Sequence, residues 1–321
     1  MAEPRYAAAS GAVGVRVDLT RTPTARSRFE GAIRVGLIAA AALSVVTTIA
    51  IVGSLLFETI EFFGEVPVGD YLFGTKWSPT FAGDQQSFGV LPLIWGTVYL
   101  SLIALAVAIP LGLLSAIYLS EYAPNRVRKV VKPVLEVLAG VPTIVFGYFA
   151  LTFFTPEVLR DTLGISSVGV FNGLSAGIVM GLLGLPTIAS VAEDAMSAVP
   201  YSLREGAFGL GASKLQVSLR IVFPAALSGI VAALVLGASR AIGETVLVLV
   251  AGGQTPNLGV NPVESYQTMA AFIAATARGD IPTGSIEYLT IFTVGFTLFV
   301  LTLVLNMVSI RLVRKYRQVY E

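Results

Sequence analysis

The chain has 321 residues, of which 55% are hydrophobic and 13% are charged, whereas about 25% of the residues of an ordinary soluble domain are charged. This composition argues against a soluble globular enzyme and favours a membrane protein. The formal net charge of +1 creates no global field for nucleic acid or acidic partners, and the absence of Cys and His excludes disulfides, thiolate or imidazole metal sites and Cys or His nucleophiles.

Long stretches without ionisable side chains divide the sequence. A helix needs about 20 apolar residues to cross the hydrocarbon core of a bilayer. The uncharged stretches that are long enough are 35–57, 90–120, 137–156, 162–192 and 288–310. One further stretch, 225–251, is interrupted only by Arg240 and Glu244. The sequence therefore predicts an all-α integral membrane protein with six transmembrane helices.

The predicted membrane domain covers residues 33–312, between a flexible basic tail at 1–32 and a short C-terminal end at 313–321. The basic tail followed by an apolar stretch resembles a signal peptide, but the apolar core of a cleaved signal has only about 7–15 residues. We therefore expect a retained first span. No repeat relates the two halves of the chain, which disfavours a secondary transporter built from inverted repeats.

Lys and Arg are distributed unequally between the segments that join these stretches. The N-terminal segment, 121–136, 193–224 and the end from Arg311 contain nearly all of them. The intervening segments contain only Lys76, Arg160 and Arg278. Short basic loops remain in the cytoplasm, so both termini are predicted to be cytoplasmic.

Small residues and prolines recur within the spans. Gly173, Gly177 and Gly181 are spaced four residues apart, which places them on one helix face and predicts close packing against another helix. Prolines at positions 110, 142 and 186 are expected to bend spans. The charged pair at positions 193 and 194 is expected to be solvated at a helix end, and contact with the following loop is the alternative.

The third predicted cytoplasmic segment, about 197–224, contains Glu205, Gly206, Ala207 and Gly211, and further on Ile221 and Pro224. Its small residues allow a short helix to insert deeply into a groove of another protein, and Gly211 can supply a turn or helix end. The alternative is a surface helix that contacts nothing. The spacing resembles the EAA loop of ABC-importer permeases, with Gly206 and Phe223 as departures from the pattern.

Arg240 and Glu244 lie in a predicted span, where insertion of an Arg costs about 2.5–3.5 kcal/mol. Such residues usually face a partner or a wet cavity, so a place on a translocation pathway is the first hypothesis. The guanidinium fork of Arg240 suits a tetrahedral oxyanion. The alternative is a structural ion pair, or a pair that faces another membrane subunit. The sequence contains no nucleotide-binding phosphate loop, so ATP-driven transport would require a separate ATPase.

Further motifs extend the resemblance from about residue 35 to 315. They are Phe88–Pro92, Ala116–Ala123, Ala139–Thr143, Leu185–Ser190, Glu193–Met196, Val199–Ala207 and Arg240–Thr245. With these motifs the chain resembles PstC, the permease family of phosphate-specific ABC transporters, and the stretch from Pro186 to Met196 favours this family over related permeases.

The resemblance implies a type I ABC importer permease fold and a subunit that forms half of a phosphate channel. It implies a PstA-like permease, two copies of a PstB-like ATPase and an external PstS-like phosphate-binding protein as partners. ATP would be used by the ATPase, and this chain would bind no cofactor and catalyse no reaction. In that family the residues matching Arg240 and Glu244 are implicated in transport, and the region matching Glu205–Gly211 couples to the ATPase.

Other interpretations remain open from the sequence alone. The substrate could be another oxyanion, such as sulfate or molybdate, because specificity can reside in the external binding protein. The chain could also be an ion-coupled secondary carrier that uses Arg240 and Glu244. A membrane enzyme or sensor scaffold is disfavoured by the absence of His, Cys and clustered carboxylates in the spans.

Overall fold

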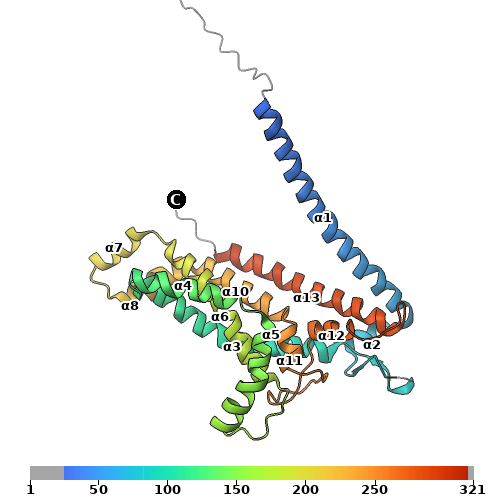
Figure 1. Ribbon diagram of the computed structural model, residues 1–321. Coiled ribbons are helices and arrows are strands. Elements are labelled where there is room, and N and C mark those ends of the chain that lie inside the picture. Colours follow the sequence, from blue (N-terminus) through green and yellow to red (C-terminus); the bar gives the residue numbers. More distant parts are fainter. Residues whose placement is uncertain (1–24, 82, 317–321) are drawn as a thin grey trace, which may run out of the picture. The chain divides into compact units, whose positions relative to one another are not determined.

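The computed structural model describes residues 25–81 and 83–316, which are predominantly helical (Figure 1). The α-helices are α1 (Ala25–Glu65), α2 (Val68–Phe73), α3 (Leu91–Ile117), α4 (Asn125–Ala139), α5 (Thr143–Phe149), α6 (Gly173–Ser197), α7 (Tyr201–Gly209), α8 (Lys214–Val217), α9 (Phe223–Ala225), α10 (Leu227–Ile242), α11 (Val246–Ala251), α12 (Met269–Thr276) and α13 (Ile286–Tyr316). The other helical segments are the 3₁₀ turn η1 (Gly83–Gln85) and the π-helical segments η2 (Tyr118–Tyr122), η3 (Ala150–Thr162) and η4 (Ser218–Val222).

A small antiparallel hairpin interrupts the helical architecture. It consists of β1 (Trp77–Ser78) and β2 (Ser87–Phe88), with Trp77 opposite Phe88. The predicted all-α class is therefore correct apart from this hairpin, which lies in the segment between α1 and α3.

Four helices among the described residues are long and apolar enough to cross a membrane: Phe29–Glu65, Leu91–Tyr122, Gly173–Ser197 and Ile286–Arg311. Two bent helix pairs raise the number to as many as six if each pair forms one span. The bends are 88° between Asn125–Ala139 and Thr143–Thr162, and 73° between Lys214–Ala225 and Leu227–Ile242. The helical membrane class is confirmed, whereas the number six and the orientation of the termini remain predictions.

The candidate span 225–251 does not form one continuous helix. Helix α10 ends at Ile242, and α11 begins at Val246 after a break at Gly243–Thr245. The stretch 137–156 is likewise broken, because Pro142 takes an extended conformation (ψ 133°) and becomes the N-cap of α5. A proline has no backbone N–H and disfavours helix in the residue before it. Pro110 and Pro186, by contrast, lie inside α3 and α6.

The chain divides into two units, residues 1–53 and 54–321. In the first unit, helix α1 begins at Ala25, within the range that the sequence assigned to the flexible tail, and residues 1–24 lie outside the described residues. Its apolar side chains, such as Leu43 and Ile49, are exposed. At the other end, α13 continues to Tyr316, and 317–321 are not described.

The second unit is built on α3, α6, α10 and α13. Helices α3 and α6 make the most extensive contact, and α10 packs against α3, α6 and α13. In this unit α7 and α8 lie at one end of the helices, whereas α2 and α12 lie near the other (Figure 1). One buried cluster joins α3, α6 and α11, and a second joins the end of α1 to α2, α12 and α13. A third cluster packs α8 and η4 against the ends of α3, α6 and α10.

Gly177 and Gly181 of the glycine stripe on α6 face α3, as their spacing predicted, whereas Gly173 faces the ring of Tyr266. A Cβ atom on Gly177 would lie 2.6 Å from Cγ2 of Ile103, and one on Gly181 would lie 2.6 Å from the backbone oxygen of Ala104. Both distances are far below van der Waals contact, so the two helices approach this closely only because the residues are glycines. The predicted packing role of the stripe is confirmed.

Replacing Gly181 with Ala is expected to destabilise the protein by about 1–3 kcal/mol, the usual cost of overpacking a core. The added methyl group meets a backbone atom of α3, which cannot rotate away. Thermal unfolding of the purified protein measures the effect. Gly64→Ala in α1 is the matched control, because a Cβ there meets nothing within 4 Å and Ala favours a helix over Gly. Equal unfolding temperatures for the two variants would contradict the packing role.

Candidate functional site

Arg240 lies in the last turn of α10 and is half-buried in the unit. Its Nη1 donates a hydrogen bond of 3.3 Å to Oγ1 of Thr187 on α6. At a rise of about 1.5 Å per residue, Arg240 is about 20 Å along the helix from Leu227. Among the residues that the structure describes, the guanidinium thus donates to a neutral hydroxyl at 3.3 Å, which leaves other N–H donors for an anion.

Glu244 lies in the break between α10 and α11 and is 9% exposed. Its Oε1 accepts hydrogen bonds of 3.2 Å from the backbone N–H groups of Thr245 and Leu247. These donors belong to the start of α11, where backbone N–H groups lack helical partners and favour a negative charge. The carboxylate therefore stabilises the start of α11.

The sequence spacing of Arg240 and Glu244, four residues apart, allows them to neutralise each other on one helix. The ion pairs among the described side chains include none between these two residues. The reason is the helix break, because Gly243 ends α10 and the Glu244 carboxylate engages the backbone of α11. The sequence predicts that both residues lie in one region, but it does not predict that Arg240 contacts α6 while Glu244 binds the backbone of α11.

The segment between α11 and α12 is fixed to α3 by aromatic side chains. Nε1 of Trp95 donates 2.7 Å to the carbonyl of Gly259, and the hydroxyl of Tyr99 donates 2.7 Å to that of Val260. The ring of Tyr266 packs on that of Tyr99 at 5.0 Å, and its hydroxyl donates 3.0 Å to the carbonyl of Asn261. Burial, followed by the nearby Tyr99 and Glu264, raises the pKa of Tyr266 to about 12. The hydroxyl therefore stays protonated as a donor at physiological pH.

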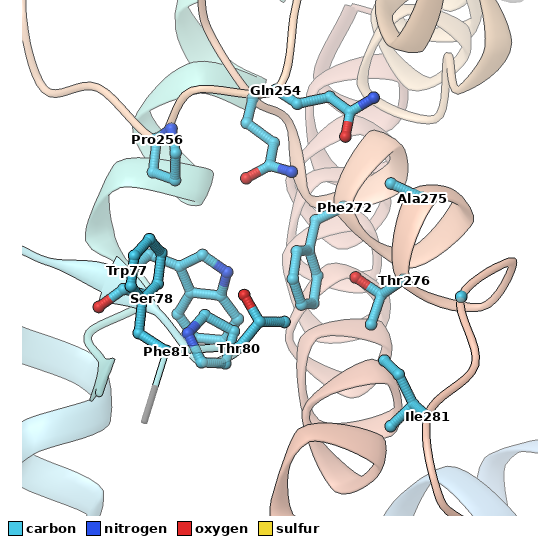
Figure 2. Close-up of a pocket in the computed structure, with 13 residues that line it drawn as sticks. Trp77, Ser78, Thr80, Phe81, Gln254, Pro256, Phe272, Ala275, Thr276 and Ile281 are labelled. Carbon is cyan, nitrogen blue, oxygen red and sulfur yellow. The ribbon is translucent and has the colours of Figure 1, made fainter. Parts of the chain in front are cut away.

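A cavity of about 400 Å³ lies between the β1 hairpin, α12 and the segment after α11 (Figure 2). Trp77 and Phe272 meet edge to face in its wall, with ring centroids 5.0 Å apart. The amide of Gln254 and the hydroxyls of Thr80 and Thr276 supply polar groups. All of the lining residues are neutral, so this cavity lacks the positive charge that distinguishes Arg240 as a candidate for oxyanion contact.

Local capping shapes the segment that carries Glu205–Gly211. Helix α7 ends in a Schellman motif, in which the N–H of Gly211 donates 2.9 Å to the carbonyl of Phe208 and the N–H of Ala212 donates 3.1 Å to that of Ala207. Gly211 has φ +82°, a conformation that favours glycine. A capping box of Ser213 and Gln216 then starts α8. The predicted turn at Gly211 is confirmed.

The α7–α8 segment (residues 201–217) leaves most of α7 exposed. Tyr201 is 69% and Leu210 90% exposed, and Phe208 is also exposed. Glu205 and Gly206 lie on the exposed surface, and a Cβ on Gly206 would meet nothing within 4 Å. Clustered exposed apolar side chains mark interaction surfaces. This favours a partner for α7 over a helix that contacts nothing.

Glu193 is not solvated, contrary to the sequence interpretation. Its side chain is 1% exposed and forms ion pairs with Arg128 and, at 2.9 Å, Lys132, while Ser197 donates a hydrogen bond of 2.8 Å to it. Burial is tolerated because two cations, one turn apart on α4, converge on the carboxylate. Asp194 is 61% exposed and pairs with Lys132, so the solvated interpretation is correct for this residue.

Arg204 is the residue that sequence analysis missed. It precedes Glu205 in α7, is 8% exposed and pairs with Glu121 in η2, the π-helical turn that follows α3. Both residues lie within motifs quoted above for the family resemblance, but only a long-range contact could identify them as partners.

The comparisons with known proteins place this arrangement in a family. Residues 108–318 match the model of the binding-protein-dependent transport system inner membrane component. The chain belongs to this family. It is a membrane-spanning ABC transporter permease and a transport component rather than an enzyme.

Relatives and solved structures agree with this assignment. A probable ABC transporter permease, YqgH of Bacillus subtilis, is 36% identical over 234 residues, covering 73% of this chain and 74% of its own. The phosphate transport system permease PstC of Haemophilus influenzae is 32% identical over 284 residues, covering 84% and 86%. A bacterial alginate ABC transporter, crystallised with an alginate pentasaccharide-bound periplasmic protein, has a chain with a TM-score of 0.60 at 17% identity, covering 89% and 97%. The structural likeness shows the fold.

Proposed function

We propose that this permease is a subunit of an ATP-driven phosphate importer and forms half of its translocation pathway. The assignment of phosphate as the substrate rests on the 32% identity to the PstC permease over most of both chains. Arg240 supports it, because a half-buried guanidinium that donates 3.3 Å to a neutral hydroxyl has further N–H groups for charge-assisted hydrogen bonds to an oxyanion. Glu244 stabilises the start of α11 through its hydrogen bonds with the backbone of Thr245 and Leu247.

The transport partners in this proposal are a PstA-like permease, a PstB-like ATPase dimer and an external PstS-like phosphate-binding protein. ATP is used by the ATPase, because the sequence has no nucleotide-binding phosphate loop, and this chain holds no cofactor. The basic segments lie in the cytoplasm with both termini. The membrane domain then covers 33–312, with the ends 1–32 and 313–321 on the cytoplasmic side.

The ATPase acts on the loop at 197–224 in this proposal. Glu205, Gly206, Ala207 and Gly211 lie on the α7–α8 segment, whose exposed apolar side chains provide the docking surface. The permease pair has two arrangements in equilibrium. ATP binding to the ATPase shifts this equilibrium toward one of them, because the contacts at the loop differ between the two arrangements. No covalent chemistry takes place on this chain.

Uptake of radiolabelled phosphate into membrane vesicles that contain the four components tests the substrate. Sulfate and molybdate in excess serve as unlabelled competitors, and vesicles without the binding protein serve as the control. We expect uptake that requires the binding protein and that neither competitor suppresses. Suppression by sulfate or molybdate would contradict phosphate as the specific substrate and identify that oxyanion as the substrate instead.

A further inference from the structure

We infer that Arg204 is the positioning residue that joins the α7–α8 segment to the ends of α6 and α3, so that a displacement of α7 reaches both helices. This inference rests on the proposed coupling of α7 to an ATPase. Arg204 itself contacts no substrate and no nucleotide.

The contacts of Arg204 connect three elements. Its Nη1 donates 2.6 Å to the carbonyl of Val199, and its Nη2 donates 2.8 Å to that of Met196 at the end of α6. Nη2 and Nε donate 2.9 and 3.3 Å to Oε1 of Glu121 in η2, the π-helical turn that follows α3. Arg204 is the buried residue of α7, so the outer face of this helix is free for a partner while the inner face is tied.

The pairing depends on the shape of the guanidinium group. Arg presents five N–H donors in a rigid planar fork, whereas Lys is a compact point charge with a flexible stem. The carbonyls of Val199 and Met196 and the carboxylate of Glu121 together accept hydrogen bonds from this planar group. Both side chains of the ion pair are largely buried, at 10% and 7% exposure, where removal of one partner leaves the other uncompensated.

A second contact links the same elements. Nζ of Lys214 in α8 lies 4.9 Å from the centroid of the Tyr122 ring in η2, a cation–π contact. The π-type hydrogen bond from the N–H of Ala123 to the carbonyl of Tyr118 closes this turn at 2.8 Å, and π-bulges are frequent at functional sites. The α7–α8 segment therefore holds η2 from both of its helices.

Open space borders the elements that Arg204 joins. A cavity of about 400 Å³ lies beside the ion pair, lined by Glu121, Arg204, Tyr201, Phe208 and Lys214 among others. Arg204 thus supplies the mechanical connection, while the exposed face of α7 supplies the contact with the ATPase.

The test uses the complete transporter in proteoliposomes, with Arg204→Lys in this chain. Arg126→Lys, at an exposed position of α4, is the matched control. We measure phosphate imported per ATP hydrolysed, and assembly by size-exclusion chromatography. For Arg204→Lys we expect assembly and ATP hydrolysis to persist while import per ATP falls by about fivefold, the lower end of typical coupling effects. The control should keep the original ratio.

An assembled Arg204→Lys transporter with the original ratio would overturn the inference. A proportional loss of hydrolysis and import, with the ratio intact, would also overturn it, because that result indicates a structural role. If the variant fails to assemble, Glu121→Gln decides, since it preserves size and an acceptor oxygen but removes the charge. An unchanged ratio in Glu121→Gln overturns the inference.

The proposed function can fail separately. An unmodified transporter that hydrolyses ATP but does not import phosphate would refute the phosphate proposal. Stimulation of hydrolysis by the binding protein then replaces import as the readout. A stimulation in Arg204→Lys equal to that of the unmodified transporter would overturn the role of Arg204, whatever the substrate.

Discussion

Replacing Arg240 with Gln is expected to lower phosphate uptake by roughly ten- to a hundredfold, the equivalent of about 1.4–2.8 kcal/mol, which is within the usual value of a hydrogen bond to a charged group. Gln retains a donor for the hydroxyl of Thr187, which Arg240 contacts at 3.3 Å, but it removes the positive charge. The loss should therefore appear in transport and not in folding. Initial rates of radiolabelled uptake in the assembled transporter measure it.

The matched control for Arg240→Gln is Arg126→Gln, which removes a cation from the exposed surface of α4. Thr187→Val is a second comparison, because it removes the neutral partner and keeps the charge, and we expect the smaller loss from it. An Arg240→Gln transporter that assembles and takes up phosphate at the original rate would contradict a role in the pathway. A loss of uptake that parallels a loss of assembly would indicate that Arg240 has a structural role only.

Replacing Gly211 with Val is expected to lower phosphate import per ATP hydrolysed by about tenfold, because a left-handed conformation costs a β-branched residue about 1–3 kcal/mol. A Cβ at this position meets nothing within 4 Å, so the effect arises from the backbone at φ +82° and not from a clash. The Schellman motif would open, and α7 would change its direction relative to α8. Membrane insertion should be unaffected.

The control for Gly211→Val is Gly211→Asn at the same position. Asn enters the left-handed region far more readily than other residues with side chains, so most of the coupling should be preserved. Import and ATP hydrolysis are measured on the same proteoliposomes. Similar coupling in the two variants would show that the conformation of Gly211 has no part in transmitting ATPase movement.

Much of the fold could be predicted from local sequence signals. Uncharged stretches predicted the helical membrane class, and the spacing of Gly177 and Gly181 predicted the packing of α6 on a neighbouring helix. Gly211 indicated a helix end because few other residues adopt its backbone conformation. These features depend on residues that are close together in the chain, so they can be predicted from the sequence alone.

Features that depend on distant partners could not be predicted. Arg204 and Glu121 are separated by 83 positions, and Arg128 and Glu193 by 65. Charge spacing gave no indication of either pair, so Glu193 was expected in solvent and Arg204 received no role of its own. The break after Ile242 was missed for a related reason. Apart from Arg240 and Glu244 the stretch 225–251 is uncharged on both sides of the break, and the carboxylate of Glu244 replaces the missing helical partners only in the folded chain.

The central claim is that this chain imports phosphate only as part of an ATP-driven assembly. Its most direct test is phosphate accumulation in proteoliposomes of the purified complex, with the phosphate-loaded binding protein outside and ATP inside, compared with proteoliposomes of this chain alone. We predict accumulation against a gradient in the complete system, and none without ATP, without the binding protein or with the single chain. Accumulation by the chain alone, driven by an ion gradient without ATP, would contradict the account and identify a secondary carrier.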